Sequence, residues 1–310
     1  MRTVPLGPTD TLVPNVVAGM MRIVDKSDAE IRDLYGAARD AGVTFFDHAD
    51  IYGGQMHACE ERFGAALDMG SSEREQITLQ TKTGIVPAEG SYDFSYDHIV
   101  SSVDGSLRAL RTDYVDVLLL HRPDALVEPD EVARAFDDLE QAGKVRAFGV
   151  SNHTPRQIDL LRTAVRQPIV ANQLQLSLSH STIVTQGLAA NMMVGGALTR
   201  DGGGVLDYCR LHGITVQAWS PFQKSDGTGV FLGAEDHPEL NAGLDRLAAR
   251  YDVTPMAIAT AWITRHPAGM QVVLGTTTPE RVTAAAAGSD IPLTRAEWYG
   301  LTRAAGNAVP

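Results

Sequence analysis

Four polar residues with complementary acid–base chemistry follow apolar runs in the sequence, either directly or within a few residues. Asp47, Lys82 and His121 each directly follow such a run, and Tyr52 comes soon after Asp47. A tyrosine hydroxyl has an ordinary pKa of about 10, which a neighbouring ammonium lowers by stabilising the phenolate. We expect Lys82 to supply this charge, Asp47 to hold the ammonium, and the imidazole to hydrogen-bond a substrate oxygen. Together these side chains could donate a proton to the carbonyl oxygen of a substrate.

Reduction of a carbonyl also needs a hydride, which no side chain supplies, so the same residues predict a bound nicotinamide or flavin. Trp219, Asn152 and Gln173 also lie at the ends of apolar runs. An aromatic plane and two carboxamides suit a nicotinamide ring. Other interpretations stay open, because Trp219 could belong to the core, Asn152 could cap a helix, and polar residues after strands often serve only in turns.

The elements that could gather these residues alternate along the chain. Short apolar runs are separated by amphipathic stretches almost to the C-terminus, which is typical of βαβ units and a parallel sheet. Eight such units favour a closed (β/α)8 TIM barrel, an α/β fold whose active site lies at the carboxyl ends of the strands. An open doubly wound sheet is the alternative. We predict strands at 14–18, 44–46, 77–81, 115–120, 145–150, 169–172, 215–218 and 271–274.

Helix starts and interruptions complete the pattern. Capping residues predict helices that begin after Ser27, Ser95, Thr154, Thr254 and Thr278. A Gly-rich insertion at 177–204, after the sixth strand, is too long for an ordinary connection and is interpreted as a mobile lid or a partly disordered loop. A second irregular segment occupies 223–237.

Composition excludes several classes of protein. The chain has 310 residues, of which 44% are apolar, so it can bury a large core, and we expect one domain over 1–310. The net charge is -12 and no basic cluster occurs, which argues against nucleic acid or an anionic membrane as partner. Cys59 and Cys209 have no metal-ligand spacing, so no metal is expected. Prolines interrupt the N-terminal segment, which predicts no signal peptide and a cytoplasmic location.

Long motifs resemble those of the aldo-keto reductase superfamily along nearly the whole chain. They are GVTFFDHADIYG at 42–53, TK at 81–82, SLRALRTDYVDVLLLH at 106–121, GKVRAFGVSN at 143–152 and AWSP at 218–221. No GxGxxG, GxxxxGK[ST], HExxH or GxSxG motif occurs, which argues against Rossmann, P-loop, zincin and α/β-hydrolase enzymes. The resemblance implies an NADPH-dependent reductase of aldehydes or ketones.

The resemblance also assigns residues to roles. It implies a catalytic tetrad of Asp47, Tyr52, Lys82 and His121, with Tyr52 as the proton donor. Ser151, Asn152 and Gln173 would hold the nicotinamide carboxamide, and Trp219 would stack on the ring. The full set of implied cofactor contacts is Met20, Met21, Asp47, Ser151, Asn152, Gln173, Trp219, Ser220, Pro221, Phe222, Gly275, Thr276, Thr277 and Arg281.

Departures from the family pattern concern the cofactor and the surroundings of the tetrad. His48 and Cys59 replace the usual threonine and serine, as in a bacterial branch of similar reductases, and His48 is expected to hydrogen-bond behind the site. Arg281 is kept, but Gly275 stands where relatives often have lysine. We therefore expect NADP(H) to be preferred with NAD(H) possible. The substrate beyond a small carbonyl compound and the oligomeric state stay open.

Two other functions compete with carbonyl reduction. One is a cofactor-binding regulatory subunit of the same superfamily with little turnover. The other is a lyase or isomerase barrel, which would more naturally carry metal ligands or a phosphate loop.

Overall fold

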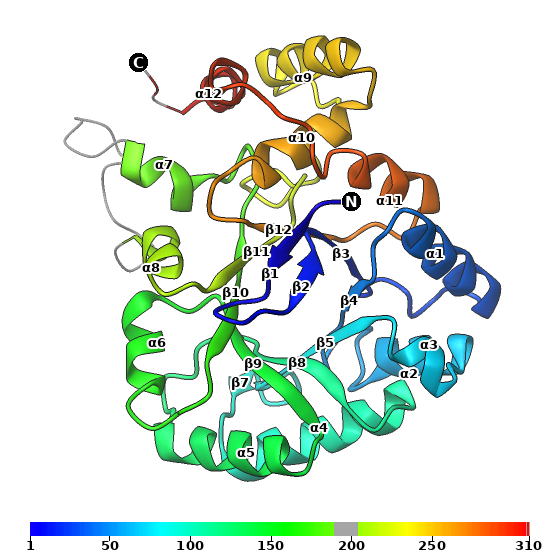
Figure 1. The fold of residues 1–310 in the computed structure, drawn as a ribbon, viewed down its shortest axis with the longest axis vertical. Coiled ribbons are helices and arrows are strands. Elements are labelled where there is room, and N and C mark those ends of the chain that lie inside the picture. The colour runs from blue at the N-terminus through cyan, green and yellow to red at the C-terminus, as the bar shows by residue number, and fades with distance from the viewer. Residues whose placement is uncertain (189–203, 308, 310) are drawn as a thin grey trace.

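Eight parallel strands form a closed barrel in this computed structural model, which describes residues 1–188, 204–307 and 309. The barrel confirms the predicted (β/α)8 architecture, and the open-sheet alternative is wrong. Figure 1 shows the strands at the centre and the helices around them. In ring order the strands are β3 (Val16–Gly19), β4 (Phe45–Asp47), β5 (Thr78–Thr83), β8 (Val115–Leu120), β9 (Val145–Ser151), β10 (Ile169–Gln175), β11 (Thr215–Trp219) and β12 (Gln271–Leu274).

Twelve helices are described. They are α1 (Asp28–Asp40), α2 (Ala58–Leu67), α3 (Ser71–Arg74), α4 (Tyr96–Leu110), α5 (Pro129–Gln141), α6 (Pro155–Leu161), α7 (Thr182–Leu188), α8 (Val205–Leu211), α9 (Pro238–Tyr251), α10 (Pro255–Thr264), α11 (Pro279–Ala286) and α12 (Arg295–Ala304). The predicted capping residues precede these helices. Ser27 and Thr154 form capping boxes with glutamate and glutamine, Ser95 and Thr254 accept backbone hydrogen bonds, and Thr278 precedes α11 without a side-chain cap. Thr154, and not Asn152, therefore caps α6.

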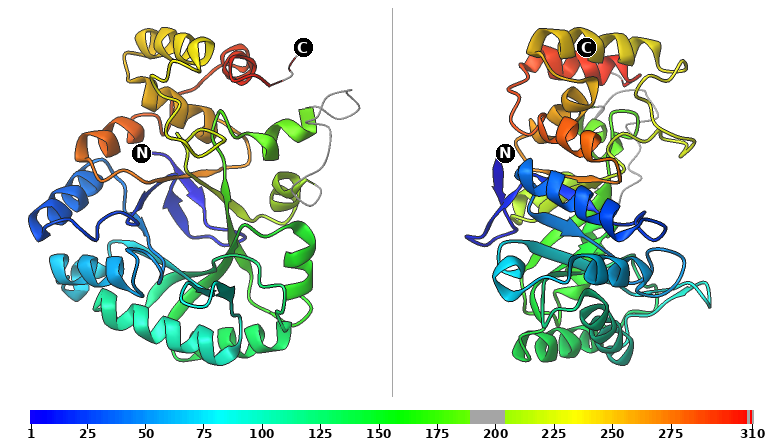
Figure 2. Two further views of the ribbon diagram at one scale, coloured as in Figure 1. Left: turned by 180° about the vertical axis from the view of Figure 1, so that it is seen from behind. Right: turned by 90° about the vertical axis from the view of Figure 1, so that its right-hand side faces the viewer.

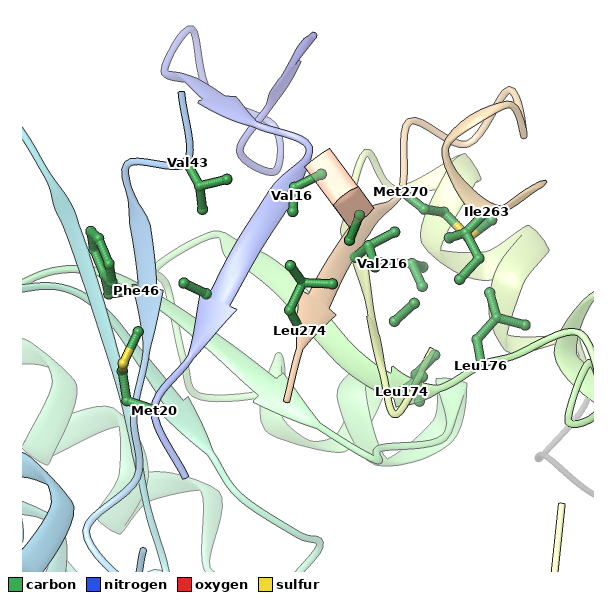
Figure 3. Packing of buried hydrophobic residues seen from close by; sticks show 14 of the residues in the cluster. Val16, Met20, Val43, Phe46, Leu174, Leu176, Val216, Ile263, Met270 and Leu274 are labelled. Atoms are coloured by element: carbon green, nitrogen blue, oxygen red, sulfur yellow. The ribbon is translucent and has the colours of Figure 1, made fainter. Parts of the chain in front are cut away.

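Side chains of the barrel strands alternate between two cores. Val16 and Ala18 of β3 pack outward beneath the helices, whereas Val17 packs inward with Phe45 and Val117. Figure 3 shows part of the outer core. The alternation continues to the strand ends, so a residue's parity decides whether it faces the interior of the barrel.

A β-hairpin that the sequence analysis missed covers the end of the barrel where β3 begins. It consists of β1 (Thr3–Pro5) and β2 (Leu12–Pro14), which pair antiparallel, and Val4 and Val13 pack into the inner core. The predicted first strand at 14–18 was wrong at its start, because Pro14 pairs with Thr3 in the hairpin and β3 begins only at Val16.

Both irregular segments keep some structure. In the insertion, residues 182–188 form α7, and 189–203 lie outside the described residues, so the lid interpretation stays a prediction. In the segment 223–237, Gln223 bridges to Val230. A short hairpin of β6 (Ile85–Val86) and β7 (Ser91–Tyr92) follows β5. The two further views in Figure 2 show the helices on the outside of the barrel.

Neither a membrane-spanning helix nor a metal-binding cluster occurs among the described residues. In the described part of the chain, no helix combines the length and the apolar character that a membrane crossing requires. Over the same residues, no group of three or more His, Cys, Asp or Glu side chains is placed to hold a metal ion.

Candidate active site

The ammonium of Lys82 joins three of the predicted residues at the carboxyl ends of β4 and β5. Its Nζ donates to Asp47 Oδ2 at 2.7 Å, to Tyr52 Oη at 3.0 Å and to the backbone carbonyl of His48 at 2.7 Å. Lys82 is completely buried and Asp47 is 2% exposed. An ammonium has three N–H donors, so all of them are used inside the protein.

Burial and charge act in opposite directions on these groups. Burial raises the pKa of Tyr52 and Lys82 lowers it, and the net shift is upward. The expectation of a lowered tyrosine pKa is therefore wrong for this structure, because burial outweighs the ammonium. Burial lowers the pKa of Lys82, but Asp47 and Tyr52 outweigh it and the net shift is again upward. At neutral pH the phenol is protonated and the lysine is charged.

His121 stands beside the tyrosine as a neutral imidazole. It follows β8, and its backbone N–H donates to Thr83 O at 2.9 Å. Its ring meets that of Tyr52 edge to face, with 5.9 Å between centroids. Burial, Lys82 and Arg122 lower its pKa well below the ordinary value. Its buried Nδ1 has no hydrogen-bond partner among the described residues. A neutral ring beside the phenol is suited to orienting an uncharged oxygen.

The predicted carboxamide ligands lie on the ends of β9, β10 and β11. Asn152 has a left-handed backbone, with φ of 60°, and its Nδ2 donates to Ser151 Oγ at 2.8 Å. Its Oδ1 accepts from Trp219 Nε1 at 3.1 Å, which fixes the indole edge. Gln173 is 3% exposed, and its Nε2 donates inward to Asp47 Oδ1 at 3.0 Å. The structure thus brings these four residues to one rim.

The remaining predicted contacts lie on loops of the same rim. Met20 is buried directly after β3, and Met21 beside it is 41% exposed. After β11, Ser220 has a left-handed backbone with φ of 52°, and the chain turns through Pro221 to Phe222. Their roles toward a cofactor stay predictions.

A positive charge that the sequence analysis missed lies at the end of β12. Arg22 Nη1 donates to the carbonyl of Gly275 at 3.1 Å. The lysine position occupied by Gly275 therefore has a guanidinium beside it, supplied by the loop after β3. The signal was present in the topology, since β3 and β12 are neighbours in the barrel.

The other predicted phosphate ligands follow Gly275 along the chain. Thr276 and Thr277 follow Gly275 as half-buried residues, and Thr276 Oγ1 accepts from the backbone N–H of Thr278 at 3.1 Å. Arg281 is exposed in the first turn of α11. Within the described residues, neither Arg281 nor Arg22 is joined to a carboxylate. Two guanidiniums that form no ion pair among the described residues, together with the N-terminus of α11, fit a phosphate-bearing cofactor.

His48 is not the hydrogen bonder that the sequence predicted. Its ring is completely buried, and neither nitrogen has a hydrogen-bond partner among the described residues. It packs edge to face on Phe63 at 4.6 Å, and burial lowers its pKa to about 4. Its contribution to the site is the backbone carbonyl that holds Lys82.

A further buried acidic residue, Asp50, lies between Asp47 and Tyr52 in the sequence. Asp50 is completely buried, and its carboxyl oxygens have no hydrogen-bond partner within the described residues. Burial, and next the charge of Glu60, raise its pKa to about 7, whereas the nearby Thr83, His57 and Ser102 act to lower it. Glu60 is itself bound by His57 Nδ1 at 2.6 Å and by Thr81 Oγ1 at 2.5 Å.

We expect Asp50→Asn to stabilise the protein above neutral pH. Because the folded-state pKa is about 7 and the ordinary value is about 3.9, the folded chain binds more protons than the unfolded chain between these values. Wild-type stability therefore falls as pH rises through this window. Thermal melts should show a gain of about 2 to 4 kcal/mol at pH 8 relative to pH 4. A variant that is equally destabilised at both pH values would contradict a raised pKa of Asp50.

Comparison with known proteins gives a consistent result. The model of the aldo/keto reductase family matches residues 15–305. An uncharacterized oxidoreductase of Bacillus subtilis is 36% identical over 302 residues, which cover 94% of this chain and 93% of that protein. A 6-dehydroglucose reductase of Agrobacterium fabrum is 36% identical over 297 residues, 92% of each chain. The crystal structure of a thermostable aldo-keto reductase with the inhibitor epalrestat has the same fold, with a TM-score of 0.78 at 24% identity, over 98% of this chain and 100% of that one.

Proposed function

Because this chain belongs to the aldo/keto reductase family and is an NAD(P)H-dependent oxidoreductase, we propose that it reduces an aldehyde or ketone with NADPH and that Tyr52 gives the proton. The observation that carries the proposal is the satisfied ammonium of Lys82. Its three donors are taken by Asp47, His48 and Tyr52. The phenolic O–H is therefore the donor left to serve a carbonyl oxygen.

The chain's own groups divide the work of the proton transfer. The hydroxyl of Tyr52 gives its proton to the carbonyl oxygen as the carbon is reduced, and Lys82 stabilises the phenolate that remains. Asp47 keeps the ammonium charged. Neutral His121 orients the oxygen by hydrogen bonding. A bound nicotinamide supplies the hydride.

Residues on two sides of the rim would hold this cofactor. Ser151, Asn152 and Gln173 would hold the carboxamide, and here Ser151 Oγ donates to the carbonyl of Gln173 while Gln173 Nε2 donates to Asp47 and Gln217. Trp219 offers a ring whose edge is fixed by Asn152. The contacts implied for Met20, Met21, Ser220, Pro221 and Phe222 lie on the connecting loops. Arg22, Arg281 and the threonines after Gly275 would bind the phosphate of the cofactor.

We expect Arg22→Ala and Arg281→Ala each to weaken NADPH by about 10-fold and to leave NADH nearly unchanged. One charge-assisted contact to a phosphate is worth about 1.5 to 3 kcal/mol, and exposure to solvent reduces this. Dissociation constants for both cofactors, measured by fluorescence titration, test the expectation. NAD(H) would then bind as a weaker alternative in wild type.

A matched control is Arg246→Ala, which removes an exposed arginine of α9 and should change neither constant. Equal losses for NADPH and NADH, or a wild type that favours NADH, would contradict the assignment of the two guanidiniums to the 2'-phosphate.

Turnover of NADPH with a panel of aldehydes and ketones tests the proposed function itself. The panel includes 6-dehydroglucose, which the name of the Agrobacterium relative gives as its substrate. Oxidation of NADPH that depends on a carbonyl supports the proposal. Tight NADPH binding without turnover on any carbonyl would favour the regulatory-subunit alternative instead.

A further inference from the structure

Four buried glutamines occupy the interior of the barrel below Asp47. We call them the glutamine network: Gln80 on β5, Gln173 on β10, Gln217 on β11 and Gln271 on β12. Each is at most 3% exposed. The interior of such barrels is usually filled by branched apolar side chains. Burying an amide costs free energy unless it is hydrogen-bonded. We therefore ask which groups bind these amides and what they contribute to the site.

The first hydrogen bonds of the network cross the barrel. Gln80 and Gln217 exchange two of them, Nε2 to Oε1 at 2.9 Å in one direction and 3.0 Å in the other. Their strands lie four positions apart in the ring whichever way it is followed. Gln217 also donates to Gln271 Oε1 at 3.0 Å, and Gln271 donates to the carbonyl of Pro14 at 2.7 Å. The network thus rests on the β1–β2 hairpin.

The other end of the network is the carboxylate of Asp47. Its Oδ1 accepts from Gln80 Nε2 at 2.6 Å and from Gln173 Nε2 at 3.0 Å. Because Asp47 Oδ1 and the carbonyl of Pro14 can only accept, the direction of the amides is fixed at both ends. Oδ2 is left for Lys82, which donates to it at 2.7 Å.

We propose that Gln80 is a positioning residue for proton transfer. It is the register neighbour of Asp47 and makes the shorter of the two amide contacts to it. Its N–H favours the charged carboxylate and fixes its rotation. Asp47 in turn holds Lys82 charged against Tyr52. The inference rests on the proposed function, and it adds a buried amide that does not touch substrate or cofactor.

The test compares Gln80→Met with Gln271→Met. Both substitutions remove a fully buried amide and a partner of Gln217, but only the first removes a contact to Asp47. We expect Gln80→Met to lower kcat by about 10- to 100-fold at an unchanged dissociation constant for NADPH. Gln271→Met should keep kcat within about twofold of wild type at a similar loss of thermal stability.

Gln80→Glu adds a pH signature that loss of packing would not give. The new carboxyl group would lie within hydrogen-bond distance of the Asp47 carboxylate. It can donate a hydrogen bond to Asp47 only when it is protonated. Activity of this variant should rise more steeply than that of wild type as pH falls from about 8 to 6.

Equal kcat values for Gln80→Met and Gln271→Met, or a Gln80→Glu profile parallel to wild type, would overturn the inference. Wild-type turnover with the carbonyl panel is the separate control on the proposed function. If wild type turns over and the two methionine variants agree, only the role of Gln80 is wrong.

Discussion

Tyr52→Phe is expected to lower kcat for carbonyl reduction by about 100- to 10,000-fold, the usual contribution of one general acid. Lys82 has no N–H left for the substrate, because every donor of its ammonium is already bound within the protein, so we expect the hydroxyl of Tyr52 to give the proton. Steady-state kinetics on the best aldehyde of the panel, together with the dissociation constant for NADPH, measure the effect. Cofactor binding should be largely intact.

Tyr251→Phe is the matched control for this substitution. It removes a tyrosine hydroxyl that binds Glu297 at 2.8 Å, and it lies at the end of α9. Its kcat should equal that of wild type. A Tyr52→Phe enzyme that retained more than half of the wild-type kcat would show that the proton comes from another group.

Lys82→Met should have the second largest effect, on both activity and stability. Removing one partner of a buried ion pair leaves Asp47 charged and uncompensated, which typically costs about 3 to 5 kcal/mol. Tyr52 loses the charge that opposes burial, so its pKa rises further and the alkaline limb of the kcat profile moves to higher pH. Chemical denaturation and kcat measured against pH record the two effects.

The sign of the pH dependence separates the ion pair from a packing defect. The folded-state pKa of Lys82 is raised, so its contribution is complete below the ordinary lysine value of about 10.4 and is lost above the folded value. The stability gap to wild type should therefore stay constant between about pH 6 and 9 and narrow as the pH rises above about 10.4, whereas a packing defect would leave the gap constant over the whole range. Adding Asp47→Asn should restore part of the stability and none of the activity. Restoration of activity would contradict the role of the ammonium.

Much of the fold, and the gathering of the predicted tetrad at one rim, could be predicted because the information for both is local. Apolar runs fixed β8 and β12 at their observed bounds, and polar residues after the runs face one rim because strand ends converge in a barrel. The resemblance then identified residues whose geometry the structure now describes. Spacing alone would not have distinguished Tyr52 from an ordinary loop tyrosine.

What the sequence could not predict depends on burial and on distant pairs. The pKa of Tyr52 shifts upward because burial outweighs Lys82, and burial is set by the whole barrel. Arg22 meets Gly275 only because the first and last barrel strands are neighbours. The N-terminal hairpin was missed because its strands have three residues each, and Pro5 and Pro14 resemble breakers.

Closure of the barrel has a consequence for synthesis of the chain. β3 pairs with β12, which follows it by roughly 250 residues, and the N-terminal segment is tied to Ser289 through Arg2 N at 2.8 Å and Asn15 Nδ2 at 2.7 Å. At a synthesis rate of about 5 to 20 residues per second, roughly 10 to 50 s pass between the synthesis of β3 and that of β12. During that time the apolar edge at Val16–Gly19 is exposed and open to wrong pairing. Folding during translation therefore ends with a ring that only the last part of the chain can close.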